Sequence, residues 1–468
     1  MQRRGLSDVG YGWRDVFQRA GLVDFPRREG SGPFYVPFRN NTRPSAPMGF
    51  AAFRNQSQVP VFTISCASCH TRNLFGRPVL GGTNLLGGTG DTLLLLKKVA
   101  GLNDRQFRFA TRPSVGETAA FHAMQYQLSF VHGKKAQAAG LENPVAFVGL
   151  SLAGRAADAH ATRTCAAQGN VDRSPLWRIP TDTKAPVLWN LKYKDRFQHD
   201  GSMTGNPMLA NLIFNEIGRG ADLRQLQRWI DGNGPVIRDM TAAARDIEAP
   251  RWTDFFPADS IDLEKAKRGE RVFRQRCARC HGTYEKAWNS PADSPAGAAR
   301  LLKTVLVTMP KRTAIRNVGT DPHRSNAMTI LAPMANRLAI FQKNGITLEA
   351  HPGAYAAPPL VGIWARWPYM HNNSIPNLDE LLKPAARRVK WFYVGPADDP
   401  RRDFDQQAVG FPLGRKSPRS WWRADRRLDT SRPGLSNAGH DEGIFATGGV
   451  SDFLPGEKRD LLEFLKTL

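Results

Sequence analysis

The sequence predicts a mainly α-helical fold with long loops, in which two similar domains follow one another along the chain. Three observations indicate this. A five-residue motif of cysteines and a histidine occurs once in each half of the chain, and a longer block is repeated downstream of each copy. The third is that 42 glycines and 33 prolines interrupt a chain without long apolar runs, which is typical of short helices joined by loops.

The repeated motif is a C-x-x-C-H run, at residues 66–70 and again at residues 277–281. This spacing is the attachment site of c-type haem, because two cysteines on one helical turn can form thioethers to the two vinyl groups of a porphyrin. The histidine that follows then becomes the proximal iron ligand. We therefore expect two covalent c-type haems, held by Cys66, Cys69 and His70 and by Cys277, Cys280 and His281.

Two other uses of paired cysteines fit less well. A structural zinc ion needs four Cys or His ligands close together, and neither run has a second C-x-x-C nearby. A thioredoxin-like redox pair would lie in a βαβ unit, and no such pattern flanks either run. Covalent haem is the interpretation that remains.

The repeated block contains a proline followed at a fixed distance by a histidine. In the first copy Ala185-Pro186-Val187-Leu188 precedes His199, and in the second Ala357-Pro358-Pro359-Leu360 precedes His371. Each histidine comes eleven residues after the leucine. This pattern indicates that each haem run is paired with one histidine-bearing block.

The same features suggest where the domains begin and end. We predict an N-terminal arm over residues 1–60, a first haem domain over 61–244, a linker over 245–261 and a second haem domain over 262–468. An insertion near residues 385–445, rich in Arg, Trp and Pro, should form surface loops. Amphipathic helices are expected before the second haem run and at the end of the chain.

Charge and composition limit the partners and the compartment. The 468 residues include 65 Lys and Arg and 42 Asp and Glu, a net charge of +23 that favours acidic protein partners or anionic surfaces. No nucleic-acid motif occurs, and no apolar stretch approaches the length of a transmembrane span. Because haem is attached covalently outside the cytoplasm, we expect a periplasmic or secreted protein, although residues 1–30 show no signal-peptide pattern.

Together, the two haem runs and the two proline–histidine blocks resemble those of the di-haem cytochrome c peroxidase family, including its rubber-oxygenase-like branch, over most of residues 60–468. The resemblance implies two tandem cytochrome c-like domains, each with one covalent haem. It implies that one haem is six-coordinate and receives electrons from a small redox protein, a cytochrome c or a cupredoxin. The other would meet hydrogen peroxide or dioxygen. Some relatives also hold calcium between the domains.

The resemblance also implies roles for the histidines. His70 and His281 correspond to the proximal ligands, and His371 to the distal ligand of the second haem, with Met370 and Met334 as alternatives. His199 stands where the peroxidases usually have tryptophan. It could ligate the first iron, line its distal pocket or bind a propionate.

Glu117 is a further candidate, because a glutamate beside an open haem could move protons during peroxide cleavage. The alternative is that it is a surface residue or a helix cap. As a whole, the sequence predicts a peroxide-reducing oxidoreductase. A haem-dependent oxygenase acting on a hydrophobic substrate and a non-catalytic di-haem electron carrier are the alternatives.

Overall fold

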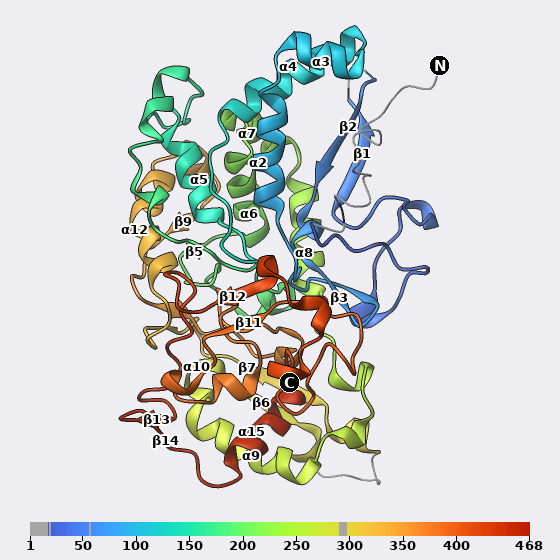
Figure 1. Cartoon of the computed structure of the whole chain (residues 1–468), viewed down its shortest axis with the longest axis vertical. Helices are drawn as coiled ribbons and strands as arrows, with labels where there is room; N and C mark the ends of the chain where they lie inside the picture. Colours follow the sequence, from blue (N-terminus) through green and yellow to red (C-terminus); the bar gives the residue numbers. More distant parts are fainter. Residues whose placement is uncertain (1–16, 18–19, 56–57, 290–296) are drawn as a thin grey trace.

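The computed structural model describes residue 17 and residues 20–55, 58–289 and 297–468 (Figure 1). Much of the predicted N-terminal arm, residues 1–16, 18–19 and 56–57, lies outside the described residues. No helix of the described part of the chain is long and apolar enough to cross a membrane, as the sequence predicted.

The helices are short, as expected for a chain so rich in glycine and proline. The longest in the described ranges, α4, has 15 residues, and many connections are single 3-10 turns. The α-helices are α2 (Thr89–Ala100), α3 (Asp104–Thr111), α4 (Val115–Ser129), α5 (Pro144–Ala153), α6 (Pro207–Gly218), α7 (Leu223–Gly232), α8 (Gly234–Asp246), α9 (Leu263–Arg276), α10 (Ala278–His281), α11 (Ala298–Leu301), α12 (His323–Asn336), α13 (Ala339–Lys343), α14 (Leu378–Leu381) and α15 (Glu457–Lys466).

The strands of the described residues form small two-stranded antiparallel sheets. The pairs are β1 (Phe50–Arg54) with β2 (Pro60–Ile64), β3 (Thr71–Leu74) with β4 (Arg77–Leu80), β5 (Met203–Thr204) with β9 (Thr347–Leu348), β6 (Thr283–Lys286) with β7 (Thr304–Thr308), β8 (Ile315–Arg316) with β10 (Tyr355–Ala356), β11 (Trp391–Tyr393) with β12 (Arg427–Asp429) and β13 (Ala446–Thr447) with β14 (Val450–Ser451).

Helix α9 leads into the second haem run and packs against the terminal helix α15, so both predicted amphipathic helices are confirmed. Asp262 caps α9 by accepting the backbone N–H of Lys265 at 3.0 Å. The apolar face of α9 carries Phe273, whose ring lies 5.2 Å from that of Phe464 in α15. The two helices cross so closely that a Cβ at Gly269 would stand 2.0 Å from the Asp460 carbonyl oxygen.

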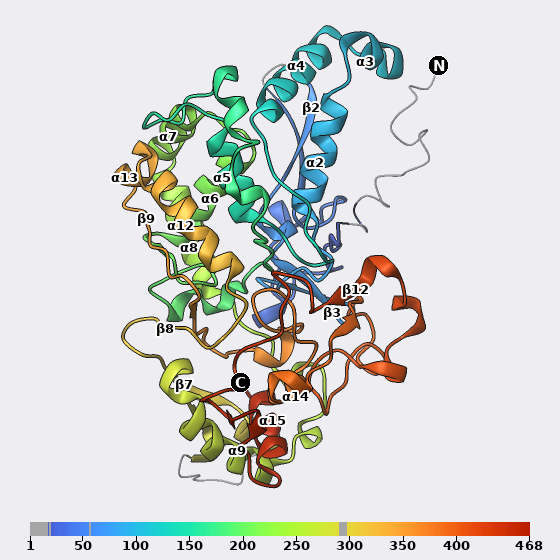
Figure 2. The ribbon, with the colours of Figure 1, turned by 60° about the vertical axis from the view of Figure 1, so that its left-hand side comes forward.

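A second core surrounds α5, a helix that is buried on nearly every side. Helix α6 covers it from the same half of the chain. Helix α12, from beyond the second haem run, covers it as well, and its Met328 and Leu331 are buried in the same cluster as Leu150 of α5. Figures 1 and 2 both show α12 lying beside α5 and α6.

The predicted fold class, two tandem cytochrome c-like domains in a mainly α-helical chain with one covalent haem each, is therefore wrong. The structure is 41% helical and 12% strand, and its halves exchange segments. Strand β9, from the second half, pairs with β5 of the first, while Leu74 and Val79 of the β3–β4 hairpin are buried with Trp252 and Trp367. The apolar face of α12 finds its cover in the first half, which local sequence patterns could not reveal.

The α9–α15 crossing leads to a stability prediction. Gly269→Ala should lower the free energy of unfolding by about 1–3 kcal/mol, because the new methyl group meets a backbone carbonyl that cannot turn aside. Reversible urea unfolding of the haem-loaded protein measures this. Gly232→Ala, at the end of α7 with no atom within 4 Å of the new Cβ, is the control and should be neutral or stabilising by up to about 1 kcal/mol. Equal effects of both variants would contradict the close crossing.

Candidate haem site

Both haem runs open on one large cavity. Its volume is about 1040 Å³, and Cys66, Cys69 and His70 line it together with Cys277, Cys280 and His281. In each run the histidine N–H donates to the carbonyl of the first cysteine at 3.0 Å, so both runs are single helical turns. The four cysteines are free thiols. The turn geometry therefore presents paired thiols and a histidine to the same space, as thioether attachment requires.

A proline carbonyl of the repeated block lies beside each of the two histidines, and at His281 it makes a hydrogen bond. His281 Nδ1–H donates to the Pro358 carbonyl at 2.8 Å, which leaves Nε2 for the cavity. Burial lowers the pKa of His70 to about 4. The Pro186 carbonyl, which lies beside the His70 ring, raises this pKa and so offsets part of the effect of burial. Burial also lowers the pKa of His281. Both imidazoles are thus neutral near neutral pH, the form that binds a metal.

Backbone hydrogen bonds join the two repeated blocks to each other. The N–H of Lys184, at the start of the first block, donates to the carbonyl of His371 in the second at 2.8 Å. In the reverse direction, the N–H of Ala356 donates to the carbonyl of His199 at 2.9 Å. The end of each block is thus fastened to the start of the other.

His440, which the sequence analysis missed, faces His281. Their ring centres are 6.2 Å apart and the rings are tilted by 33°. Two imidazoles on opposite sides of one metal ion, with metal–nitrogen distances of about 2 Å, place their ring centres about 6 Å apart. Burial, followed by the positive potential of His281, lowers the pKa of His440 to about 3. Its backbone has a φ of 57°, a left-handed conformation that non-glycine residues adopt mainly where the surrounding structure holds them.

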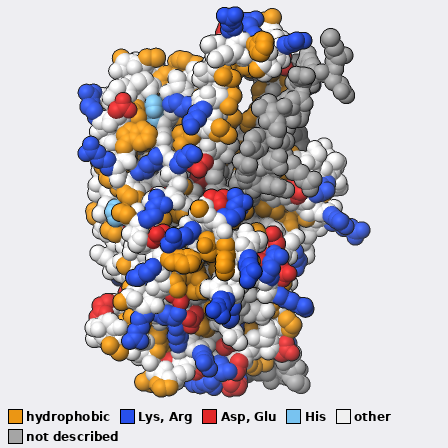
Figure 3. Space-filling view, in the orientation of Figure 1, with side chains coloured by type: hydrophobic (Ala, Val, Ile, Leu, Met, Phe, Trp, Pro, Cys, Tyr) orange, Lys and Arg blue, Asp and Glu red, His pale blue; other side chains and the backbone are white. Residues whose placement is uncertain are grey.

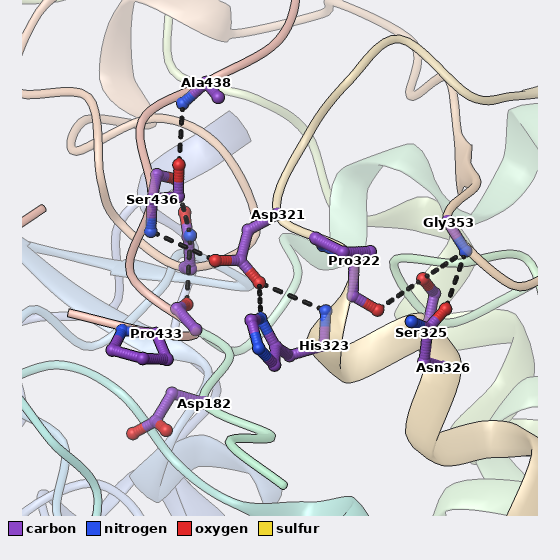
Figure 4. A network of polar contacts seen from close by, with 12 residues as sticks. Asp182, Asp321, Pro322, His323, Ser325, Asn326, Gly353, Pro433, Ser436 and Ala438 are labelled. Atoms are coloured by element: carbon purple, nitrogen blue, oxygen red, sulfur yellow. Dashed lines mark hydrogen bonds and ion pairs between the residues drawn. The ribbon is translucent and has the colours of Figure 1, made fainter. Parts of the chain in front are cut away.

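An acidic side chain fastens the segment that carries His440, as Figure 4 shows. The buried carboxylate of Asp321 accepts the N–H of Ser436 at 3.1 Å and the N–H and Nδ1–H of His323 at 3.1 and 2.9 Å. Asn372, next to His371, donates to the Ser436 carbonyl at 3.1 Å. The start of α12 and the second repeated block therefore hold the segment from both sides. The sequence offered no signal for this residue, because the first half contains no copy of it.

His371 and His199 lie together, with ring centres 6.4 Å apart; His371 is buried and His199 partly buried. His371 stacks on Tyr355 and donates from Nε2 to the Tyr355 hydroxyl at 3.1 Å, while His199 donates from Nε2 to the Lys184 carbonyl at 3.0 Å. Desolvation, reinforced by the Arg324 guanidinium, holds the pKa of both histidines well below the usual range. Their Nε2 atoms are thus engaged, while Nδ1 of His371 is buried without a hydrogen-bond partner in the described part of the chain. His440 is the histidine that makes a ring contact with His281 among the described residues, so the assignment of His371 as a distal ligand stays a prediction.

The predicted catalytic Glu117 is a helix cap. Its carboxylate accepts the N–H of Ser114 at 2.7 Å, and its own N–H donates to the Ser114 hydroxyl at 3.2 Å, a capping box at the start of α4. The cavity is lined instead by Glu142, which accepts the N–H groups of Thr89 and Gly90 at 2.7 and 2.9 Å. Burial raises the pKa of Glu142 to about 7.

The charge of the cavity wall suits anionic groups. Burial lowers the pKa of Lys194 to about 8 and that of Arg366 to about 10. Arg324 pairs with Asp200, but its buried Nε has no hydrogen-bond partner in the described part of the chain. Such cations fit the propionate carboxylates of haem. Eight Lys and Arg line the cavity against three Glu: Lys184, Lys194, Arg219, Arg276, Arg279, Arg316, Arg324 and Arg366, with Glu142, Glu216 and Glu442.

The expectation of calcium gains no support from the described ranges, in which no three His, Cys, Asp or Glu side chains form a group that could hold a metal ion. The predicted haem ligands need no such group, because the porphyrin supplies four of the six positions around the iron and a single turn supplies the proximal histidine.

Comparison with known proteins supports a haem protein. Residues 354–392, which include Pro358 and His371, match a family model described as RoxA-like, cytochrome c-like. The chain is 26% identical over 348 residues to the uncharacterized protein y4iJ of Sinorhizobium fredii, which covers 60% of this chain and 54% of y4iJ. It is 25% identical over 341 residues to the uncharacterized protein y4iM of the same strain, which covers 61% of this chain and 65% of y4iM.

These alignments span less than two thirds of the length of either relative. The family match is nevertheless informative, because a cytochrome c-like segment implies a covalent c-type haem. It supports the cytochrome c and rubber-oxygenase-like side of the predicted resemblance and a haem oxidoreductase in general. The peroxidase family is not confirmed by it. We conclude that the chain is similar to RoxA-like cytochromes c around the second repeated block.

Proposed function

We propose that this chain is an oxidoreductase with two covalent c-type haems, one that passes electrons and one that meets hydrogen peroxide. A single observation carries the proposal. His281 is faced by His440 with ring centres 6.2 Å apart, whereas His70 makes no such ring contact with any residue that the structure describes. The two sites thus share a C-x-x-C-H turn on the proximal side and differ in the histidine that faces it.

When bound, an iron with two axial histidines serves electron transfer, and one with a free sixth position can bind a small oxidant. The chain supplies the surroundings. Pro358 holds His281 in the tautomer that presents Nε2 to the cavity. The partly buried cations of the wall, such as Lys194 and Arg366, would hold the propionate carboxylates of haem. The Nε2 atoms of His199 and His371 are bonded to the Lys184 carbonyl and the Tyr355 hydroxyl, and neither ring makes a ring contact with His70 in the described part of the chain.

Reduction of hydrogen peroxide breaks its O–O bond, consumes two electrons and two protons and yields two waters. A small one-electron donor, a cytochrome c or a cupredoxin, would supply the electrons in two steps. Glu142 is the cavity carboxyl suited to hold a proton, because burial raises its pKa to about 7 and both of its forms are populated near neutral pH. Since haem is attached outside the cytoplasm, the proposal includes a periplasmic or secreted location.

A second candidate is an oxygenase that adds dioxygen to a hydrophobic substrate at the site of His70. Two observations favour it: the RoxA-like match and the apolar side chains of the cavity wall, among them Leu93, Phe147 and Phe214. Dioxygen consumption that depends on an emulsified unsaturated hydrocarbon, without an external electron donor and without peroxide turnover, would select this activity over the first.

Spectroscopy of the haem-loaded protein tests the assignment of the two sites. We expect two haems per chain in a pyridine assay, one of them low-spin and the other able to bind carbon monoxide when reduced. His440→Gly should turn the low-spin haem high-spin, because the iron loses its second imidazole. His371→Gly is the matched control and should leave that haem low-spin, since its ring is bound to Tyr355.

The opposite result, a spin change in His371→Gly alone, would restore His371 as the distal ligand. Two low-spin haems that ignore both carbon monoxide and peroxide would show a non-catalytic electron carrier instead. A single haem per chain would remove the division of labour on which the proposal rests.

The pKa of Glu142 gives a prediction on stability and pH. An unfolded glutamate has a pKa of about 4.3, whereas burial raises the pKa of Glu142 to about 7, so the folded state retains a proton that the unfolded state has lost. The stability contributed by this group is present at low pH and is lost as the pH rises through about 7. Glu142→Gln cannot ionise, so its free energy of unfolding relative to wild type should rise by about 2–3 kcal/mol between pH of about 5 and about 8.

Urea unfolding at a series of pH values measures this difference. Glu264→Gln, which removes a carboxylate from the exposed side of α9, controls for the loss of one negative charge at the surface. A difference for Glu142→Gln that stays flat with pH would mean that the Glu142 carboxyl is already ionised throughout this range.

A further inference from the structure

An exposed aromatic cluster lies on the β11–β12 hairpin, outside the cavity. It consists of Trp391 and Tyr393 on β11, Arg427 on β12 and Trp422 on the connecting segment, and we call it the Trp391 patch. Trp391 is 47% and Trp422 48% exposed. Figure 3 shows hydrophobic side chains gathered over β11 and β12, with Lys and Arg around them.

The members of the Trp391 patch support one another. The ring of Tyr393 lies 5.6 Å from that of Trp391 and 6.2 Å from that of Trp422, to which it is nearly parallel at 16°. The guanidinium of Arg427 lies 4.9 Å from the Trp391 ring. The patch is therefore a preorganised surface of Trp, Tyr and Arg, the residue types that dominate binding energy in protein–protein interfaces.

The surroundings of the patch are strongly basic. Residues 385–432 contain twelve Lys and Arg against six Asp and Glu. Several of these cations, including Lys390, Arg419 and Arg423, are exposed around the hairpin. A surface with this charge attracts a negatively charged partner and speeds its encounter.

The hairpin is joined to the segment of His440 by a short route. Val389, two residues before Trp391, accepts the Asn437 Nδ2–H at 2.8 Å through its carbonyl. The buried Arg388 donates to the carbonyl of Gly439, next to His440, at 2.8 Å and also to the Asn437 carbonyl. The patch and His440 are thus connected through a few covalent and hydrogen bonds.

We propose that the Trp391 patch is the docking surface for a small acidic one-electron donor protein. The inference rests on the proposed function, since it takes His440 as the second ligand of the iron held by His281. One electron leaves the metal centre of the donor, which is oxidised, and reduces that iron from the ferric to the ferrous state. The transfer makes no bond and moves no proton.

The charge and composition of the patch favour an acidic protein over other occupants. A neutral polysaccharide would gain little from the surplus of Lys and Arg around the rings. A second copy of this chain, with its net charge of +23, would be repelled. The short connection between the patch and His440 favours an electron donor over a redox-inactive acidic protein, because an electron arriving at the patch would have a short route to the proposed iron ligand.

The experiment compares binding and electron transfer in the full-length, haem-loaded protein. The probe is a reduced cupredoxin with a net negative charge, and a cytochrome c with a net positive charge serves as the counter-probe. The double variant Trp391→Ala, Arg427→Ala should weaken cupredoxin binding at least tenfold by calorimetry and reduce the salt dependence of the second-order rate of haem reduction. Reduction by dithionite, which needs no docking, should stay unchanged.

The matched control is Trp229→Ala with Arg228→Ala on α7, where the tryptophan is 45% exposed and thus similar to Trp391. This variant should bind the cupredoxin as wild type does. Equal weakening by both double variants, preferential binding of the positively charged cytochrome c, or occupancy of the patch by a polysaccharide or a second copy would overturn the inference.

The experiments distinguish a failure of the proposed haem ligands from a failure of the proposed docking surface. If His440→Gly leaves the haem spectrum unchanged while the Trp391 variant still loses cupredoxin binding, the docking surface stands and the route through His440 falls. If the spectrum changes as expected but binding is unaffected by the Trp391 variant, the proposed function stands and the docking surface is rejected.

Discussion

A single cavity that both haem runs share is the constraint on which the rest of the structure depends. Its walls come from both halves of the chain, because one run lies in each half and both line the same cavity. Two backbone hydrogen bonds join the halves at this cavity, one between Lys184 and His371 and one between Ala356 and His199. Two independent domains, each closed around its own haem, could not share a wall in this way. The interleaved packing of α12 and of the β3–β4 hairpin follows from the same need.

Some parts of this shared cavity occur in both halves of the chain, and one part occurs only in the second half. The repeated parts, a helical turn with two thiols and a proline carbonyl beside the histidine, determine how a haem is attached and oriented. The asymmetric part is His440, which comes from a segment without a counterpart in the first half. Asp321 and Arg388 hold that segment by hydrogen bonds to its backbone. The proposed division of labour between the two sites therefore needs no change in the repeated parts.

Positive charge serves two purposes in this chain, and burial separates them. Inside the cavity Lys194 and Arg366 have lowered pKa values because they are desolvated, and an anionic ligand would relieve that cost. Around the β11–β12 hairpin the cations are solvated, so each contributes little to stability but adds to a long-range field. The net charge of +23 is the sum of both and by itself identifies neither.

The sequence by itself determined the two C-x-x-C-H turns and the nearby helices. A C-x-x-C-H turn is local, and the amphipathic period of α9 and α15 is visible in the residues themselves, so these features were predicted from residues 263–281 and from the end of the chain. Only the tertiary structure decided which segments share a core and which histidine stands opposite His281. His440 and Glu142 reach the cavity through contacts between residues far apart in sequence, and Glu117 caps a helix instead. Periodicity and spacing describe what one segment can do, whereas a distal ligand or a cavity wall depends on which segments fold back to meet it.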